Sequence, residues 1–186
     1  MKTDLLHGSL VHLTVQDPET MAQLFSQWSG DSEYSRLLDW DPACRFSVHS
    51  SQKWLEKDSE KQINYYFSIR TLEEDKIIGL IGLDGIQWTH GDCFVGIGLG
   101  EREFWGKGYG TDAMKIILRY AFTELNLQRV SLNVFEYNPR GVRSYEKAGF
   151  SHEGRERGLL LREGKRWDVI FMGILREEWL KQKENQ

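Results

Sequence analysis

Residues 105–111, with the sequence WGKGYGT, are the part of the chain whose residue types most directly suggest chemistry. Gly106, Gly108 and Gly110 alternate there, just before an apolar repeat of helical spacing that runs to about Leu125. Glycines at the start of a helix expose backbone N–H groups where the helix dipole also favours an anion, as in pyrophosphate sites. Glycines are equally typical of a turn that needs positive φ angles, so the sequence supports both interpretations.

The spacing of these glycines excludes the two best-known nucleotide-binding loops. A P-loop has four residues between its first glycine and a Gly-Lys pair, whereas five residues separate Gly100 from Gly106, and Lys107 precedes Gly108. The dinucleotide fingerprint G-x-G-x-x-G is also absent, because the order here is G-x-G-x-G after a predicted antiparallel hairpin. A nucleoside triphosphatase and a nicotinamide-binding fold are therefore not expected.

Residues 138–150, NPRGVRSYEKAGF, form the second segment that points to a ligand. Asn138 and Tyr145 lie seven positions apart, which is two turns of a helix, so both side chains share one face and can address one ligand. Asn before Pro139 is also typical of a helix cap, and a cap and a ligand contact are compatible. The alternative for Tyr145 is a half-buried core tyrosine.

The predicted strand over residues 93–99 has one nearly bare face. Gly96 and Gly98 share that face with Phe94, while Val95 and Ile97 point to the other face. Glycine weakens a strand, and it commonly marks a bulge or a place where a ligand or another backbone comes close. Both interpretations stay open for this strand.

The elements that position these segments alternate between strands and helices. Alternating and β-branched runs predict strands at residues 9–15, 63–71, 76–88, 93–99, 130–135, 150–161 and 166–175. Apolar residues at helical spacing predict helices near residues 18–28, 52–58, 111–125, 139–148 and around Trp179. Because strand, helix and strand follow one another at 93–135, the fold class is α/β with a central mixed sheet of about seven strands, mostly antiparallel with one parallel pair, flanked by helices.

The composition predicts one globular domain. The chain has 186 residues, 40% hydrophobic and 28% charged, and a single core usually serves roughly 100–200 residues. The formal net charge of −4 offers no basic surface for nucleic acid. Cys44 and Cys93 form neither a CxxC nor a Cys/His pattern, so no disulfide framework or zinc site is expected. No stretch approaches the ~20 apolar residues of a membrane helix, so a cytoplasmic protein with no membrane partner is expected.

Together, the two motifs resemble those of the GNAT superfamily of acetyl-CoA-dependent N-acetyltransferases. The acyl-carrier loop of that family reads Gln/Arg-x-x-Gly-x-Gly/Ala, and residues 105–110 occupy it with Trp105 in place of Gln or Arg. A later family segment, N-x-x-A-x-x-x-Y-x-x-x-G-F, is similar to residues 138–150, with Gly141 in place of Ala. The resemblance covers about residues 63–175 and is closest to the branch that contains ribosomal-protein N-terminal and spermidine acetyltransferases.

The resemblance implies a single N-acetyltransferase domain over residues 1–186. It implies an acceptor-side variable part at 1–62, an acetyl-CoA-binding core at 63–175, and a C-terminal helix and tail at 176–186. The implied reaction moves an acetyl group from acetyl-CoA, a co-substrate, to a primary amine by direct attack in a ternary complex without a metal. The implied partner is a small-molecule amine or a protein N-terminus, and a homodimer is compatible. The alternatives are a catalytically silent CoA-binding or regulatory module and, less favoured, a nucleotide-binding enzyme.

Residue roles also follow from the resemblance. Asn138 would hydrogen-bond the pantetheine arm, and Tyr145 would be the catalytic acid that protonates the leaving thiolate. The implied coenzyme-binding residues are Gly98, Leu99, Gly100, Trp105, Gly106, Lys107, Gly108, Tyr109, Gly110, Thr111, Asn138, Arg143 and Tyr145. Because backbone N–H groups do most of the holding, the loop is expected to work without the Trp105 side chain. Lys107, Arg140 and Arg143 could meet coenzyme phosphates, but each is also typical of a solvated surface charge.

No residue is singled out as the base that deprotonates an ammonium acceptor before attack. Candidates near the predicted strand turns are Asp84, His90 and Asp92. Candidates in the early variable segment are Glu33, Asp39 and Asp41. The latter lie near Tyr34 and Trp40, where charge and cation–π attraction would suit a cationic amine. All of these residues are also typical of solvated turns, and the acceptor stays open among a protein N-terminus, a polyamine, an aminoglycoside and other amines.

Overall fold

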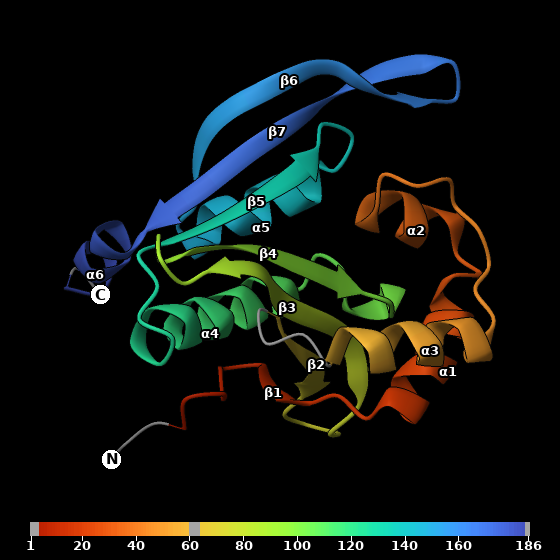
Figure 1. Ribbon diagram of the computed structural model, residues 1–186, viewed down its shortest axis with the longest axis horizontal. Coiled ribbons are helices and arrows are strands. Elements are labelled where there is room, and N and C mark those ends of the chain that lie inside the picture. Colours follow the sequence, from red (N-terminus) through yellow and green to blue (C-terminus); the bar gives the residue numbers. More distant parts are fainter. Residues whose placement is uncertain (1–3, 60–63, 185–186) are drawn as a thin grey trace.

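The computed structural model describes residues 4–59 and 64–184 and contains one seven-stranded sheet, in the order β1-β2-β3-β4-β5-β7-β6 (Figure 1). The strands are β1 Val11–Val15, β2 Tyr65–Thr71, β3 Ile77–Gln87, β4 Asp92–Leu99, β5 Arg129–Phe135, β6 Ser151–Arg162 and β7 Lys165–Leu175. The helices are α1 Pro18–Trp28, α2 Ser32–Leu38, α3 Val48–Ser59, α4 Tyr109–Thr123, α5 Pro139–Ala148 and α6 Arg176–Glu184, with a 3₁₀ turn, η1, at Arg102–Phe104.

β4 and β5 form the parallel pair of the sheet, and they pair over a short distance. On β4 the pairing extends from Asp92 to Phe94. Beyond that point β4 continues along β3 to Leu99, whereas β5 continues along β7 to Phe135. The sheet therefore opens between the C-terminal ends of these two strands, and the expected mixed sheet with one parallel pair is confirmed.

The predicted element boundaries differ from the structure by a few residues. β2 begins at Tyr65, and the predicted start of that strand, Ile63, lies outside the described residues. β6 begins at Ser151, because the Phe150 N–H donates to the Tyr145 carbonyl at the end of α5 instead of pairing in the sheet. α3 begins before Gln52, at Val48.

Within residues 4–59 and 64–184, none of the helices combines the length and apolar character needed to cross a bilayer.

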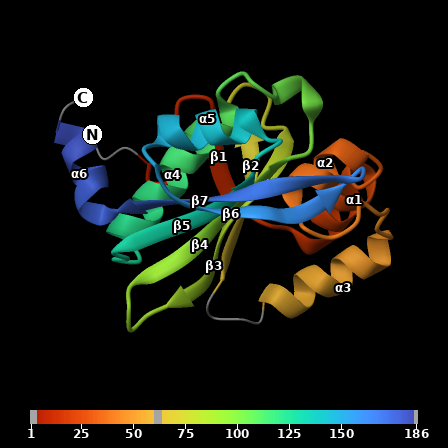
Figure 2. The ribbon, with the colours of Figure 1, turned by 90° about the horizontal axis from the view of Figure 1, so that it is seen from above.

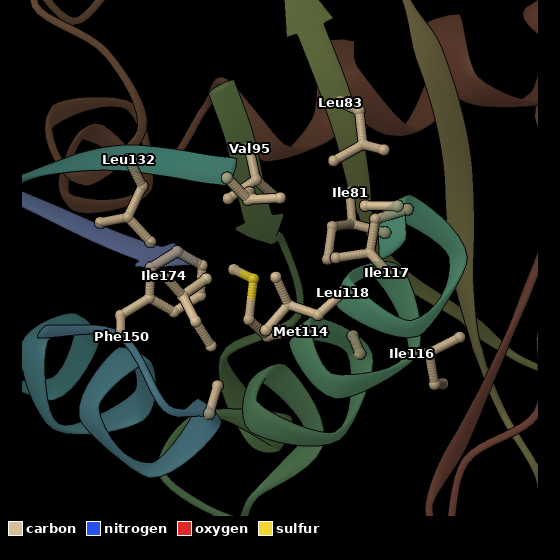
Figure 3. Close-up of a cluster of buried hydrophobic side chains, with 14 of the residues drawn as sticks. Ile81, Leu83, Val95, Met114, Ile116, Ile117, Leu118, Leu132, Phe150 and Ile174 are labelled. Atoms are coloured by element: carbon tan, nitrogen blue, oxygen red, sulfur yellow. The ribbon is translucent and has the colours of Figure 1, made fainter. Parts of the chain in front are cut away.

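Two buried clusters of side chains occupy opposite faces of the sheet. Under α4 and α5, Met114 packs in one cluster with Val95 of β4 (Figure 3). On the other face, Trp28 of α1 and Tyr34 of α2 share a cluster with Leu80 of β3. Figure 2 shows α4 and α5 on one side of the sheet and α3 on the other. The opening between β4 and β5 therefore connects two differently covered faces.

The predicted cap at Asn138 is confirmed, and α1 has a cap of the same kind at Asp17. Asp17 Oδ2 accepts a hydrogen bond of 2.9 Å from the Thr20 N–H at the start of α1. Asn138 Oδ1 accepts one of 2.9 Å from the Gly141 N–H at the start of α5. Gly149 ends α5 with a φ of 107°, a left-handed conformation that favours glycine. Helix caps and C-terminal glycines depend on residues that are close in the sequence, so the amino-acid pattern alone can predict them.

The segment before β1 is held against α4 by a carboxylate. Asp112 Oδ2 accepts hydrogen bonds from the N–H groups of Ser9, Leu10 and Val11 at 2.9, 2.8 and 3.1 Å. Seven positions further along α4, the Arg119 guanidinium donates to carbonyl oxygens of residues 4–7. Nothing in the sequence distinguishes these two side chains from ordinary surface charges.

We expect Asp112→Ala to lower the free energy of unfolding by ~1.5–3 kcal/mol, because several N–H groups lose a charged acceptor. Asp112→Asn, which keeps an acceptor oxygen, should lose less. Urea unfolding measures both, with Glu74→Ala in an exposed turn as the control. If Asp112→Ala unfolds at the same urea concentration as the control, the carboxylate does not hold this segment.

Candidate active site

A cavity of about 430 Å³ opens where β4 and β5 separate. Residues of α4 and α5 line one end, and Tyr34, Leu37 and Leu38 of α2 line the other, so the cavity passes through the sheet. The predicted coenzyme-binding residues that line it are Gly98, Leu99, Trp105, Gly106, Gly108, Gly110, Thr111, Asn138, Arg143 and Tyr145. The volume lies within the usual range of ligand sites, roughly 300–1,000 Å³.

Three of the predicted coenzyme-binding residues do not line this cavity. A side chain at Gly100 would overlap the Trp28 ring, so this glycine allows α1 to pack closely. The Tyr109 ring packs edge-to-face on Phe104, with 5.0 Å between ring centroids. Lys107 is exposed on the loop. Sequence spacing placed these residues next to the site without revealing which way each one faces.

The geometry of the glycine loop confirms the turn interpretation and is compatible with the anion-binding one. Gly106 and Gly108 have φ angles of 74° and 95°, so the turn does need residues that tolerate the left-handed conformation. Gly108 is also the residue that precedes α4, and the first helical hydrogen bond is donated by Asp112 to the Gly108 carbonyl. The N–H groups of residues 109–111 are thus left without a helical acceptor, as at any helix start, and can bind an anion.

The α4–α5 end of the cavity is positively charged. Lys115, Arg140, Arg143 and Lys147 line it. In the described part of the chain, Asp112 is the one carboxylate that lines the cavity, and it is already occupied by backbone N–H groups. Positive side chains beside a helix N-terminus favour a ligand with several negative charges.

Trp105 has a structural role that the sequence did not indicate. Its indole N–H donates a hydrogen bond of 2.7 Å to the carbonyl of Leu99, the last residue of β4. The ring also lies 4.1 Å from the Arg140 guanidinium and 5.0 Å from that of Arg102, measured to the ring centroid. Trp105 therefore links the glycine loop to the end of β4 and to the start of α5.

Asn138 and Tyr145 lie on the cavity side of α5, as their spacing predicts. The Asn138 cap uses its oxygen, so its amide nitrogen is still able to donate a hydrogen bond. A Cβ at Gly141 would lie 2.7 Å from that nitrogen. The glycine, at a position where the family commonly has alanine, therefore leaves space for the Asn138 amide. Burial raises the pKa of the Tyr145 hydroxyl to about 12, so this phenol is protonated at neutral pH.

The bare face of β4 is covered at Gly98, although Gly96 on the same face is exposed and a Cβ there would meet nothing within 4 Å. A Cβ at Gly98 would lie 2.9 Å from Leu38 Cδ1 and 3.0 Å from Tyr34 Oη, so α2 covers the end of this face. The accessible backbone of β4 is instead its edge toward β5, where pairing has ended after Phe94. The glycine therefore allows α2 to approach, and the opening between the strands provides the ligand surface.

The acidic residues of the early variable segment do not line the cavity. Arg102 binds both Asp31 and Glu33, with 2.7 Å from Nη2 to Asp31 Oδ1 and 2.7 Å from Nη1 to Glu33 Oε2. The hydrogen-bonded Arg102 holds the pKa of Asp31 below its usual value. Neither these two acids nor Asp39 and Asp41 line the cavity. They do not supply free negative charge at its wall.

The other candidate bases also lie away from the cavity wall. Asp92 begins β4, six positions before Gly98, which is about 20 Å along a strand. His90 is in the exposed turn before it, and Asp84 is exposed on β3. Over residues 4–59 and 64–184, no group of His, Cys, Asp and Glu side chains gathers in a way that could hold a metal ion.

Two further side chains affect the chemistry of the site. Cys93 is buried at the start of β4, and burial raises the pKa of its thiol to about 12, so it is not a nucleophilic thiolate at neutral pH.

Tyr34 is only 4% exposed, lines the cavity, and has a hydroxyl without a hydrogen-bond partner among the described residues. No sequence signal revealed that this hydroxyl would be buried and unpaired.

Residues 9–151 match the family described as "Acetyltransferase (GNAT) domain". The chain is 38% identical over 132 residues to the probable N-acetyltransferase YjcK of Bacillus subtilis (strain 168), covering 70% of each chain. It is 33% identical to the spermidine N(1)-acetyltransferase of Vibrio cholerae, covering 70% of this chain and 76% of that one. The crystal structure of spermidine N-acetyltransferase from Vibrio cholerae, in complex with CoA and spermine, has the same fold, with a TM-score of 0.82, 24% identity, and coverage of 91% of this chain and 98% of that chain.

We expect Trp105→Phe to lower the free energy of unfolding by about 0.5–1.5 kcal/mol, because the ring is kept while the hydrogen bond to Leu99 is lost. Trp105→Ala should lose more, since the contacts with both arginines also disappear. Trp88→Phe and Trp88→Ala, at an exposed tryptophan, are the matched controls. Equal urea midpoints for the Trp105 and Trp88 variants would show that the indole does not support the loop.

Proposed function

Because this chain belongs to the GNAT family and is an acetyl-CoA-dependent N-acetyltransferase, we propose that it acetylates the primary amine of a small molecule within the cavity described above. One observation carries the proposal. The cavity crosses the sheet where β4 and β5 separate, with the N-terminus of α4 at one end and α2 at the other. Two substrates can therefore reach one point from opposite faces, as direct transfer in a ternary complex requires.

The coenzyme would enter from the α4–α5 end. Its phosphates would lie against the N–H groups of residues 108–111 and beside Lys115 and Arg143, which line the cavity. Its pantetheine arm would run along the edge of β4 that faces β5, and the Asn138 amide nitrogen would donate a hydrogen bond to it. The mix of helix dipole and positive side chains supports a pyrophosphate at this end.

Tyr145 would act as the general acid. As the amine nitrogen forms a bond to the acyl carbon and the C–S bond breaks, the departing sulfur takes the Tyr145 proton. The proton that the nitrogen loses returns to the phenolate through solvent. A coenzyme thiol has a pKa of about 8.5, so a tyrosine of pKa about 12 is protonated whenever the thiolate needs a proton.

The state of the cysteines supports direct attack rather than an acyl-cysteine. Cys93 is a buried thiol whose pKa is raised to about 12, and it does not line the cavity. Cys44 is exposed and does not line the cavity either. An acyl-enzyme needs an activated nucleophile within reach of the thioester, and neither residue meets that condition.

The proposed acceptor is a small primary amine. A relative named for acetylating spermidine makes a polyamine the first amine to test. Asp31 and Glu33 are already paired with Arg102, so they do not supply free charge to attract a cationic amine. We therefore propose a small primary amine, with an aminoglycoside and a peptide N-terminus as further arms of the same test.

Thiol release from acetyl-CoA in the presence of these amines tests the proposed function directly. Calorimetric titration with acetyl-CoA, ATP and NAD should show binding of the first alone. Amine-dependent thiol release identifies an enzyme and its acceptor class. Coenzyme binding without thiol release for any amine would identify the silent-module alternative.

We expect Gly110→Val to weaken acetyl-CoA binding roughly 10-fold or more, because added methyl groups overfill the cavity. Gly110→Ala is the matched control. Its Cβ would lie 3.5 Å from Leu99 Cδ1, an ordinary contact, and this glycine needs no left-handed φ. Gly108→Val is a poorer test, since its φ of 95° strains any side chain. Unchanged affinity in folded Gly110→Val would exclude a coenzyme at this wall.

Tyr145→Phe should reduce kcat by roughly 10²–10⁴-fold while leaving folding and acetyl-CoA affinity nearly unchanged, since only the acidic proton is lost. The wild-type hydroxyl keeps its proton below its pKa of about 12. The kcat of the wild type should therefore not fall between pH 8 and 10 on account of this group. A pH profile of kcat for both proteins measures this. A near-wild-type kcat for Tyr145→Phe would leave Tyr145 as a core residue.

A further inference from the structure

The Tyr34 hydroxyl is a buried polar group that packing alone does not explain. Its side chain is 4% exposed and belongs to the cluster of Trp28 and Leu80, whose apolar contacts need no hydroxyl. The hydroxyl has no hydrogen-bond partner in the described part of the chain, and a buried donor without an acceptor costs free energy. Because Tyr34 also lines the cavity, a ligand there can supply the missing acceptor.

The Tyr34 ring is held in one position by contacts on several sides. It packs on Trp28, with 6.0 Å between ring centroids. Its own N–H donates to Asp31, which in turn is bound by Arg102. The other end of α2 is tied to the turn after β5, because the Tyr137 hydroxyl donates a hydrogen bond of 2.7 Å to the Arg36 carbonyl. A donor held this rigidly loses little freedom when a ligand arrives.

The hydroxyl lies against the part of β4 that borders the opening. A Cβ at Gly98 would be 3.0 Å from Tyr34 Oη, so the glycine leaves just enough space for the phenol to meet the strand. Gly98 and Tyr145 line the same cavity, with Tyr145 on the opposite face of the sheet. A thioester whose sulfur lies near Tyr145 would have its acyl group in the space between the two tyrosines.

The protonation state restricts what this hydroxyl can do. Burial raises the pKa of Tyr34 above that of an ordinary tyrosine, so the group stays neutral and cannot serve as the base for the amine. A neutral phenol can donate one hydrogen bond. In a thioester reacting with an amine, the acyl oxygen is the acceptor whose negative charge increases during attack.

We propose that Tyr34 is a second catalytic tyrosine, which donates a hydrogen bond to the acetyl oxygen from the α2 side of the sheet. The inference rests on the proposed function and deepens it. When the nitrogen lone pair forms the C–N bond, the C=O electron pair moves onto oxygen, and Tyr34 stabilises that charge without giving up its proton. When the carbonyl re-forms, the C–S bond breaks and the sulfur takes the Tyr145 proton, so each tyrosine serves a different atom.

The test is Tyr34→Phe, measured with acetyl-CoA and with CoA. Because CoA lacks the acetyl oxygen, its affinity should be unchanged by calorimetry, whereas acetyl-CoA should bind a few-fold more weakly. The kcat should fall roughly 10²-fold for every accepted amine, with the KM for amine unchanged. The variant should melt at the same or a higher temperature than the wild type, because it loses an unpaired buried hydroxyl.

Tyr120→Phe is the matched control, since Tyr120 is a half-buried tyrosine that does not line this cavity. A Tyr34→Phe protein with wild-type kcat and an unchanged ratio of acetyl-CoA to CoA affinity would overturn the inference. A rise in the KM for amine alone would overturn it too, because Tyr34 would then bind the acceptor. Absence of turnover in the wild type would instead reject the proposed function, and the affinity ratio would still test the contact.

Discussion

The separation of β4 from β5 is the constraint on which the site depends. The two strands pair from Asp92 to Phe94 on β4 and then follow different neighbours, β3 and β7. Backbone N–H and C=O groups on the two diverging edges cannot satisfy each other, and buried backbone groups need partners. A flexible arm with amide groups, such as pantetheine, is the kind of ligand that suits such an opening.

The two ends of the cavity differ because different elements cover the two faces of the sheet. Lys115, Arg140, Arg143 and Lys147 approach from α4 and α5. At the other end, Leu37 and Leu38 of α2 make the wall apolar, and Tyr34, whose hydroxyl is buried, lies beside them. This distribution of charge favours an anionic group at one end of the cavity and an uncharged group at the other.

Arg102 connects the two ends. It neutralises Asp31 and Glu33 beside α2, and its guanidinium also lies on the Trp105 ring. Trp105 in turn fixes the last carbonyl of β4 and contacts Arg140 of α5. The 3₁₀ turn that carries Arg102 therefore relates the position of α2 to that of the glycine loop.

The sequence by itself determined the features that depend on nearby residues. The Asn138 cap, the end of α5 at Gly149, the left-handed turn at Gly106 and Gly108 and the order of strands could be inferred because propensity and periodicity act over a few positions. Only the tertiary structure decided which face of β4 is covered, that Arg102 pairs with acids 71 and 69 positions earlier, and that the Tyr34 hydroxyl is buried unpaired. Those outcomes depend on contacts between segments far apart in the chain, which no local pattern encodes.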